Sequence, residues 1–448
     1  MPAKKKTTKA TSRRTKKVPR QVNAISKLKG MKDILPEDSK YWKLVTKKAI
    51  ELSKVYSFQR IETPILESTS LFEKAYGKTS NLINKETLSF TDKKGDKLTL
   101  RADAVPGLVR AGLEHNIFAV GKVFKSFWLG PIFKYDQNQA GRLRQTYQFS
   151  LDVFGNFGPT ADAQLILIGY NFFKELQVEV EVQINSMGCP ECRKEYIEKL
   201  LECYKERGKK SKLCDECRKQ IAKDPMQLLN CKDPKCMELA CEIPPTVDHL
   251  CTECRDYFVK VLEHLDSLSI PYNLNHHLVS TRGYDSYNKT IFEFAPLSEA
   301  GKYVALGGGG NYSQLSEDLG SKGISACGLG IDIEKTISRI RSNNIAVKNG
   351  DSTDVFVAQL SESAKHKAML IFEELRRAGF KARECFVKDN LKDQLEEAEN
   401  SNARYTLILG QKELQDNMIL IRDMESGAQE FIDIKKIINE LDKRLNIG

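Results

Sequence analysis

The chain has 448 residues, of which 41% are hydrophobic and 29% charged, a balance typical of a soluble globular protein with about two to four domains. Every long apolar stretch is interrupted by charge before the ~20 residues that a membrane span needs, and no apolar signal-peptide core follows the N-terminus. We therefore expect a cytoplasmic protein that is neither embedded in a membrane nor secreted.

The net charge of +10 is concentrated at the N-terminus, because residues 1–20 contain nine Lys and Arg residues and no Asp or Glu. Residues 1–22 are of low complexity and are predicted to form a disordered tail. Such a tail serves either as an electrostatic arm for nucleic acid or only as a solvated extension. A mitochondrial transit peptide shares the basic composition, but this segment lacks the large apolar residues of an amphipathic face.

The first predicted helix begins near Asp38 or Ser39, both plausible N-caps, and runs to about residue 56. Helix patterns also occur at 102–115 and 162–175. Strand patterns occur at 58–61, 87–91, 97–100, 120–129, 132–135, 146–154 and 178–184. Because many strands alternate with few helices and no regular βαβ repeat is present, the pattern favours an α/β protein built on an antiparallel sheet.

The second half of the chain predicts a smaller domain after a linker. Strand patterns return at 288–294 and 303–306, a helix pattern covers about 331–341, and residues 342–353 are polar. Beyond them, the sequence predicts strands at 355–360, 381–386, 405–409, 418–422 and 430–434, and helices at 362–378, 391–400 and the C-terminus. This segment has the size of a compact α/β domain.

Ten of the twelve cysteines lie between Cys189 and Cys254. Without a secretory signal, clustered CxxC pairs indicate a metal site before disulfides, and the spacing suits tetrahedral zinc. The candidate metal ligands are Cys189, Cys192, Cys214, Cys217, Cys251 and Cys254, with a looser pair, Cys231 and Cys236, and Cys241 beside it. The alternative is a set of reduced core cysteines, and the spacing does not determine which four bind.

Three further stretches carry residues suited to binding chemistry. Residues 307–310 are four consecutive glycines, which permit close backbone approach to a ligand or form only a flexible turn. Residues 133–154 place Lys134, Arg142 and Arg144 on a hairpin, which suits a polyphosphate or is only an exposed basic loop. Residues 282–287, RGYDSY, combine an arginine with two tyrosines and are uninformative alone.

Together these stretches resemble the class II aminoacyl-tRNA synthetases, and within them the histidyl-tRNA synthetase family. The resemblance covers about residues 25–445, and its motifs occur in the family's order. They are 30–36 (GMKDILP), motif 1 at 58–72 (FQRIETPILESTSLF), motif 2 at 129–155, the two histidine motifs at 282–293 (RGYDSYNKTIFE) and 305–312 (ALGGGGNY), and motif 3 at 328–335 (GLGIDIEK).

The resemblance implies a fold, a reaction and partners. The expected fold is a class II antiparallel sheet with flanking helices in a catalytic domain of residues 23–341. A cysteine-rich helical insertion at 189–265 interrupts it, and a linker at 342–353 leads to an α/β anticodon-binding domain at 354–448. The implied reaction is ATP-dependent activation of histidine and transfer of the histidyl group to the 3′ end of histidine tRNA. ATP and Mg²⁺ are the implied cofactors, zinc is a candidate structural metal, and motif 1 implies a homodimer.

The resemblance also assigns roles to residues. Arg282 matches the family's cation at the α-phosphate and Lys134 its motif 2 partner, while Asp136, Gly330 and Lys335 match positions that bind ATP. The positions that match the histidine pocket are Asp103, Val105 and Gln148 at the amino end, Asp152 and Tyr287 at the imidazole, and Gly307 and Gly308. Gln137, Gln139 and Arg142 match positions that meet the tRNA acceptor end.

Several of these positions depart from the family pattern. Lys134 and Lys335 replace arginines, which keeps the charge but removes the bidentate fork. The family's usual LRPEGT is LRADAV at 100–105, and its usual Glu and Tyr are Asp152 and Ser286. One interpretation is a working ligase with compensated changes. The others are an impaired paralogue that acts as an RNA-binding or regulatory protein, and a synthetase for a different acceptor. The histidine-biosynthesis regulatory paralogue usually lacks the anticodon domain that this chain has.

Overall fold

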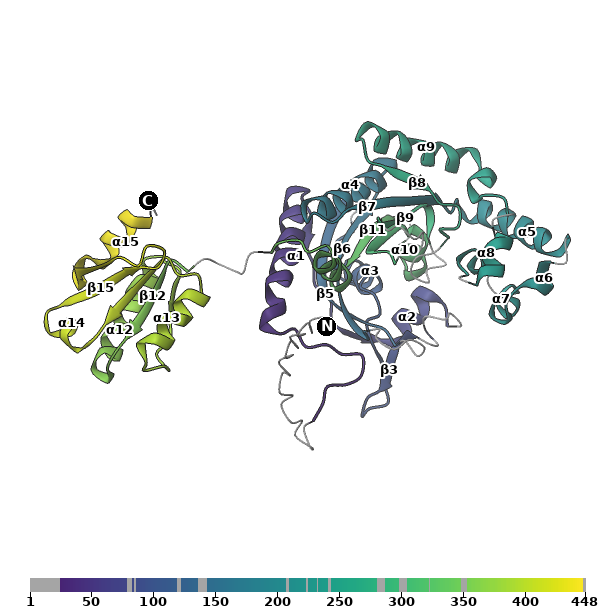
Figure 1. The fold of residues 1–448 in the computed structure, drawn as a ribbon. Helices are drawn as coiled ribbons and strands as arrows, with labels where there is room; N and C mark the ends of the chain where they lie inside the picture. Colours follow the sequence, from purple (N-terminus) through teal and green to yellow (C-terminus); the bar gives the residue numbers. More distant parts are fainter. Residues whose placement is uncertain are drawn as a thin grey trace, which may run out of the picture. The chain divides into compact units, whose positions relative to one another are not determined.

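The computed structural model describes residues 25–78, 83, 86–118, 122–135, 143–206, 209–222, 225–231, 233–240, 243–279, 287–297, 304–321, 323–347 and 353–445 (Figure 1). The chain divides into two compact units, Met1–Ile345 and Ala346–Gly448, which we describe separately. Among the described residues, none of the helices combines the length and the apolar content that crossing a bilayer requires.

The first unit is built on an eight-stranded sheet in the order β1-β5-β6-β11-β10-β9-β7-β8. The six central strands pair antiparallel, while the short edge strands β1 and β8 run parallel to their neighbours. The predicted antiparallel sheet is therefore confirmed. The strands are β1 (Gln59–Arg60), β5 (Phe124–Phe133), β6 (Gln145–Gly155), β7 (Val180–Ser186), β8 (Tyr272–Leu274), β9 (Asn288–Pro296), β10 (Gly307–Asn311) and β11 (Ser325–Asp332).

Helices flank this sheet, and a small sheet, in the order β2-β4-β3, lies beside it. Helix α4 covers one face with aromatic side chains, since the Phe149 ring lies 5.6 Å from Phe172 and the Phe294 ring 5.4 Å from Phe173. These elements are α1 (Pro36–Val55), β2 (Leu66–Ser68), α2 (Thr69–Tyr76), β3 (Leu88–Thr91), β4 (Lys97–Leu100), α3 (Val105–Glu114), α4 (Pro159–Glu175), α10 (Ser313–Leu319) and α11 (Ile333–Ser342).

A helical insertion leaves the sheet after β7 and returns to it at β8 (Figure 1). Its last helix, α9, packs along α4. The insertion consists of α5 (Pro190–Glu206), α6 (Lys209–Lys212), α7 (Asp215–Gln220), η2 (Pro225–Asn230), α8 (Pro234–Ala240), η3 (Thr246–His249) and α9 (Thr252–Ser267). Because the pieces between α5 and α9 have only four to seven residues each, their stability must come from packing and cross-links rather than from helix propensity.

The second unit is a five-stranded sheet, in the order β13-β12-β14-β15-β16, with a hydrophobic core on each face. In β12, Val355 and Val357 belong to one core and Phe356 and Ala358 to the other, as strand alternation requires. The elements are β12 (Val355–Gln359), α12 (Glu362–Arg377), β13 (Ala382–Glu384), α13 (Leu391–Asn400), β14 (Tyr405–Leu409), α14 (Gln411–Gln415), β15 (Met418–Asp423), β16 (Gln429–Asp433), η4 (Ile434–Lys436) and α15 (Ile437–Leu445).

Two predicted elements differ from the structure in an informative way. The strand predicted at 303–306 is wrong for its described residues, because β10 begins at Gly307 and consists of the glycine run itself. The strand patterns at 120–129 and 132–135 belong to one strand, β5, which continues through Pro131. In both cases pairing with neighbouring strands overrides the local preference of glycine and proline.

Candidate active site

The central strands build a strip of backbone without side chains on one face of the sheet. Residues directly opposite each other in an antiparallel pair lie on the same side of the sheet. In β10 and β11, Gly308 pairs with Gly330 and Gly310 with Gly328, and we call these four residues the glycine floor. On the β6 side the floor continues to Asp152, which pairs with Gly328. The floor therefore carries no side chains of its own, and β6 provides polar side chains at its border.

Two positions of the floor require glycine because side chains already occupy the space above them. A Cβ atom at Gly328 would collide with Asp152 Oδ1 and lie 2.9 Å from the Tyr312 ring. A Cβ atom at Gly310 would lie 2.5 Å from the Thr290 carbonyl oxygen and 2.9 Å from Tyr287 Cδ1. The structure thus brings Asp152, Tyr287 and Tyr312 together over the floor, and two of these three are predicted site residues.

Gly307 lies on the other face of the sheet. It pairs with Ile331 on one side and with Phe294 on the other, on the face that α4 covers. Of the two glycines predicted in the histidine pocket, Gly308 belongs to the floor and Gly307 does not.

Asp152 is held by two hydroxyl donors in a buried environment. The Tyr312 hydroxyl donates to Asp152 Oδ1 at 2.7 Å, and the Ser150 hydroxyl lies 2.9 Å from Asp152 Oδ2. Burial, followed by the neighbouring Asp152, raises the pKa of Tyr312 well above its usual value, so this tyrosine stays a neutral donor. Sequence reasoning selected Asp152 but not Tyr312, since 160 positions separate the two.

Gln148 supplies an unused donor on the same face. It pairs with Asp332 of β11 and is 4% exposed. Its Nε2 atom is buried without a hydrogen-bond partner among the described residues. Because a buried amide donor without a hydrogen-bond partner is costly, the lack of one among the described residues beside the glycine floor favours a polar ligand there.

The two predicted lysines follow strands that end at the same edge of the sheet. Lys134 comes directly after β5, whose last residue pairs with the first residue of β6, and its N–H donates to Arg144 O at 2.8 Å. Lys335 follows β11, whose last residue pairs with Gln148, and its Nζ lies 3.2 Å from Ala305 O. Both cations are thus placed at the end of the floor where Gln148 lies.

Glu334, which is not among the predicted site residues, directly precedes Lys335 in the chain. Glu334 Oε2 accepts a hydrogen bond from Tyr147 N–H at 2.8 Å. Burial raises the pKa of Glu334 to about 7, against the effect of that hydrogen bond. Asp332 caps α11 by accepting from Lys335 N–H at 2.9 Å. An aspartate between a strand and a helix is a recognisable cap signal, whereas the burial of Glu334 depends on tertiary packing.

Asp103 and Val105 are both buried at the start of α3. Asp103 Oδ1 accepts from Val105 N–H at 2.9 Å, so one carboxyl oxygen organises the helix start. The neighbouring Arg101, which sequence reasoning missed, donates to Pro131 O and Thr63 O at 2.9 and 2.8 Å. Its guanidinium stacks 4.3 Å from the Trp128 ring, and desolvation lowers its pKa to about 10. Arg101 therefore holds the segment that precedes α3 against β5 through this hydrogen bond to Pro131 and the contact with Trp128.

Five predicted site residues lie outside the described residues, so the structure says nothing about their placement. They are Arg282, Asp136, Gln137, Gln139 and Arg142.

The cysteine-rich insertion brings its cysteines into two groups of four. Cys189, Cys192, Cys251 and Cys254 form what we call the root cluster, at the two ends of the insertion. Cys214, Cys217, Cys231 and Cys236 form the insertion cluster. Within each group the sulfur atoms lie within 4.8 Å of one another. All six predicted candidates occur in these groups, whereas Cys231 and Cys236 were outside the six and Cys241 lies outside the described residues.

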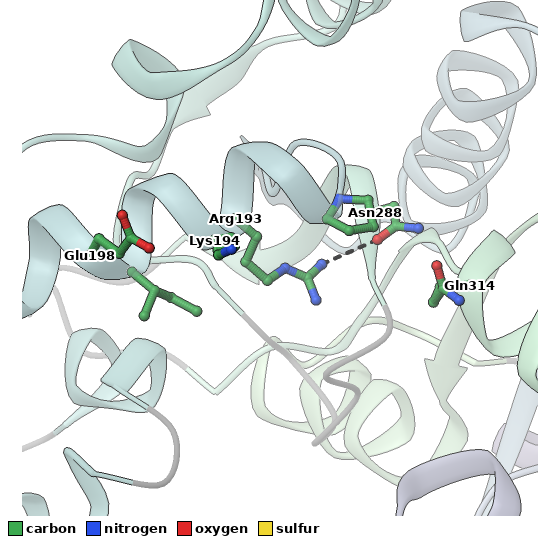
Figure 2. A pocket seen from close by; sticks show the side chains of 7 residues that line it. Arg193, Lys194, Glu198, Asn288 and Gln314 are labelled. Atoms are coloured by element: carbon green, nitrogen blue, oxygen red, sulfur yellow. Dashed lines mark hydrogen bonds between the residues drawn. The ribbon is translucent and has the colours of Figure 1, made fainter.

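A cavity of about 540 Å³ lies between α5 of the insertion and the sheet (Figure 2). Arg193, Lys194 and Glu198 line it from α5, and Asn288 and Gln314 line it from β9 and α10. Arg193 crosses to the sheet, where its Nη2 donates to the Tyr287 carbonyl and lies 3.2 Å from Asn288 Oδ1.

Comparison with known proteins agrees with this geometry. A histidyl-tRNA synthetase family model matches residues 30–336, and an anticodon binding domain model matches residues 354–444. A histidine–tRNA ligase from Halothermothrix orenii is 36% identical over 419 residues, 93% of this chain and 98% of that protein. One from Clostridioides difficile is 34% identical over 93% of this chain and 99% of its own length. A crystal structure of apo S. aureus histidyl-tRNA synthetase matches with a TM-score of 0.77 at 28% identity, over 93% of this chain and 100% of that chain.

The first unit is an antiparallel sheet with a glycine floor, polar side chains at its border and lysines after its strands. An anticodon-binding domain follows it in the chain. This combination is that of a class II aminoacyl-tRNA synthetase. Within that class, the chain belongs to the histidyl-tRNA synthetase family. The predicted family and fold class are confirmed, and histidine–tRNA ligation is the activity that this family carries. The family implies the use of ATP and Mg²⁺, with histidine and tRNA as partners.

Proposed function

We propose that this chain activates histidine with ATP to form histidyl-adenylate and pyrophosphate, and then transfers the histidyl group to the 3′ end of histidine tRNA. The observation that carries this proposal is the glycine floor, bordered by Asp152 and Gln148. A strip without side chains lets a small ligand approach the backbone closely, and the polar border supplies recognition.

Histidine occupies the floor in this proposal. Asp152, fixed by Tyr312, accepts a hydrogen bond from the imidazole, and the Tyr287 ring packs beside it. Gln148 meets the amino-acid end, where its Oε1 accepts from the ammonium group and its Nε2, which has no partner among the described residues, donates to the carboxylate. Asp103 contributes a further negative charge at the ammonium, with Val105 and Gly308 as apolar and backbone contacts.

The adenylation step is positioning and charge stabilisation. The histidine carboxylate attacks the α-phosphorus, the bond from that phosphorus to the bridging oxygen breaks, and pyrophosphate leaves. Arg282 and Lys134 neutralise charge at the α-phosphate, Lys335 meets the γ-phosphate, and Asp136 and Gly330 line the nucleotide. When bound to the triphosphate, Mg²⁺ would supply further neutralisation of its charge.

The tRNA contacts involve both parts of the chain. We assign Gln137, Gln139 and Arg142 to the acceptor end, and residues 354–448 to the anticodon. The basic residues 1–20 add electrostatic attraction to the phosphate backbone.

The proposed organisation completes this assignment. A catalytic domain covers residues 23–341 with an insertion at 189–265, and a linker at 342–353 leads to the anticodon-binding domain. We propose that the protein works in the cytoplasm as a homodimer through the motif 1 segment, and that zinc in the insertion is structural. Light scattering of the purified protein tests the dimer, which a monomeric mass would contradict.

The test of the function is pyrophosphate exchange that depends on both ATP and histidine, followed by charging of histidine tRNA. Exchange with histidine and not with the other amino acids is the expected result. Folded protein without exchange would favour the impaired paralogue, and exchange with another amino acid would favour a different acceptor. The Gln148→Ala variant serves as the matched comparison, since it is expected to raise the KM for histidine more than the KM for ATP.

A further inference from the structure

The two cysteine groups have the geometry of tetrahedral metal sites rather than of disulfides. All eight cysteines are free, and the sulfur atoms of Cys189 and Cys192 lie 3.4 Å apart while those of Cys214 and Cys231 lie 3.9 Å apart. A tetrahedron of sulfurs ~2.3 Å from a zinc ion has edges of roughly 3.8 Å. The observed separations lie on either side of this edge length.

We propose that the chain binds two zinc ions, one in the root cluster and one in the insertion cluster, and that the root zinc positions Tyr287 through Arg193. The occupancy of the two sites is independent of the proposed function, whereas the effect on Tyr287 rests on it. The chemical class of the ligand follows from the donors, because four cysteine sulfurs within 4.8 Å of one another match the ligand set of a closed structural zinc site.

Backbone N–H groups in both clusters already point at sulfur. Cys251 N–H donates to Cys192 Sγ at 3.1 Å in the root cluster. In the insertion cluster, Cys214 N–H donates to Cys236 Sγ at 3.3 Å and Cys217 N–H to Cys214 Sγ at 3.4 Å. Such donors stabilise thiolate ligands and fix their orientation around a metal. Reduced cysteines that only fill a hydrophobic core would not require backbone N–H groups directed at their sulfur atoms.

The root cluster joins the two ends of the insertion. Cys189 and Cys192 flank the start of α5, directly after β7, and Cys251 and Cys254 flank the start of α9. About sixty residues separate the two pairs in the chain. A metal at this point closes that long loop and fixes both helices to the edge of the sheet.

The insertion cluster holds together the small helices at the other end. It links the start of α7, the end of η2 and the middle of α8, none of which exceeds seven residues. Helices this short are not stable alone. A metal with four ligands replaces part of the core that such a small module cannot build.

Arg193, next to the root cluster, contacts Tyr287, whose ring lies over the glycine floor. Arg193 follows Cys192 in α5, its N–H donates to Cys189 O at 3.0 Å, and its guanidinium donates to the Tyr287 carbonyl. Figure 2 shows the neighbouring hydrogen bond from Arg193 to Asn288. Lys289 N–H donates to Gly188 O at 2.8 Å and ties the same turn to β9. The Tyr287 ring lies over Gly310, so the position of the first turn of α5 determines where this ring stands above the floor.

The first experiment is metal analysis of the full chain, purified without chelator. We expect two zinc ions per chain in the unaltered protein and one in each of Cys254→Ser and Cys236→Ser. Cys203→Ser and Cys385→Ser are matched controls outside both clusters and should retain two. A ratio of one or none in the unaltered protein overturns the two-site proposal. Substitution with Co²⁺ should give the visible spectrum of tetrahedral thiolate coordination, and an octahedral spectrum would contradict it.

The second experiment tests the link to Tyr287. Arg193→Ala leaves both cysteine clusters intact, so it should retain two zinc ions and a normal thermal transition. We expect the KM for histidine in pyrophosphate exchange to rise about tenfold or more, with little change in the KM for ATP. Lys194→Ala, which removes the neighbouring cation that lines the same cavity, is the control. An unchanged KM in Arg193→Ala refutes the positioning role and leaves the zinc measurement standing. Absence of exchange in the unaltered protein refutes the proposed function instead.

Discussion

Removing the Tyr312 hydroxyl tests whether the Asp152 pair recognises histidine or only stabilises the fold. Tyr312→Phe deletes one oxygen and keeps the ring, whose centroid lies 6.2 Å from that of Phe154. The deleted hydroxyl donates at 2.7 Å to Asp152 Oδ1 in a buried setting. A hydrogen bond to a charged group contributes about 1.5–3 kcal/mol. If Asp152 binds the imidazole, the loss corresponds to a rise of roughly ten- to 150-fold in the KM for histidine.

The chain provides a matched control on the other face of the sheet. Tyr257 of α9 donates to Asp162 Oδ2 of α4 at 3.0 Å, and burial raises the pKa of Asp162 to about 6. Tyr257→Phe therefore removes the same chemical group from another buried pair. Both variants should unfold more easily by about 1–3 kcal/mol.

The assay is histidine-dependent pyrophosphate exchange at saturating ATP, combined with thermal unfolding. Only Tyr312→Phe should change the KM for histidine. If both variants lose stability and neither changes this KM, the contact between Tyr312 and Asp152 only stabilises the fold, and other residues bind the imidazole.

Three further predictions concern Glu334, Lys335 and the basic N-terminal segment. Because burial raises the pKa of Glu334 from 4.5 to about 7, its contribution to stability is full below about pH 4.5 and is lost as the pH rises through 7. Glu334→Gln should thus gain melting temperature relative to the parent between pH 4.5 and 8, and a constant difference would contradict this. Lys335→Ala should lower kcat/KM for ATP by about tenfold or more while Lys335→Arg retains activity, and equal activity of both would exclude a phosphate contact. Deleting residues 1–20 should reduce the salt dependence of tRNA affinity, and an unchanged slope would identify the segment as a solvated tail.

The elements that were predicted well are those in which local preference and tertiary context agree. The helix pattern at 391–400 and the strand pattern at 405–409 match α13 (Leu391–Asn400) and β14 (Tyr405–Leu409). Asn390 caps α13 by accepting from Lys392 N–H, which is a signal visible in the sequence. Helix α1 begins at Pro36, slightly before the predicted caps, because proline is favoured in the first turn and Asp38 is used in an ion pair with Lys32.

The site could be predicted only in part, because its decisive contacts join distant residues. The CxxC spacing predicted six candidate ligands, but only the fold shows that Cys189 lies near Cys251 and Cys214 near Cys231. The motif resemblance selected Asp152 and Gln148, whereas nothing local indicates that Tyr312 reaches Asp152 or that Gln148 Nε2 lacks a partner among the described residues. Sequence spacing therefore indicates which residues are candidates for the site, and strand register determines which of those residues lie on the same face of the sheet.

The glycine strand shows why a functional site was also the place where the secondary-structure prediction was wrong. Four consecutive glycines have little preference for a strand and contribute no side-chain packing, so β10 depends on its two neighbours for its place. Those neighbours also require glycine, since a Cβ at Gly309 would collide with the Gly328 carbonyl. The apolar residues of β9 and β11, Phe292, Phe294 and Leu329, supply the packing instead, on the face that carries no predicted polar site residue. The glycine strand can thus lack side chains of its own because the opposite face of the sheet supplies the packing.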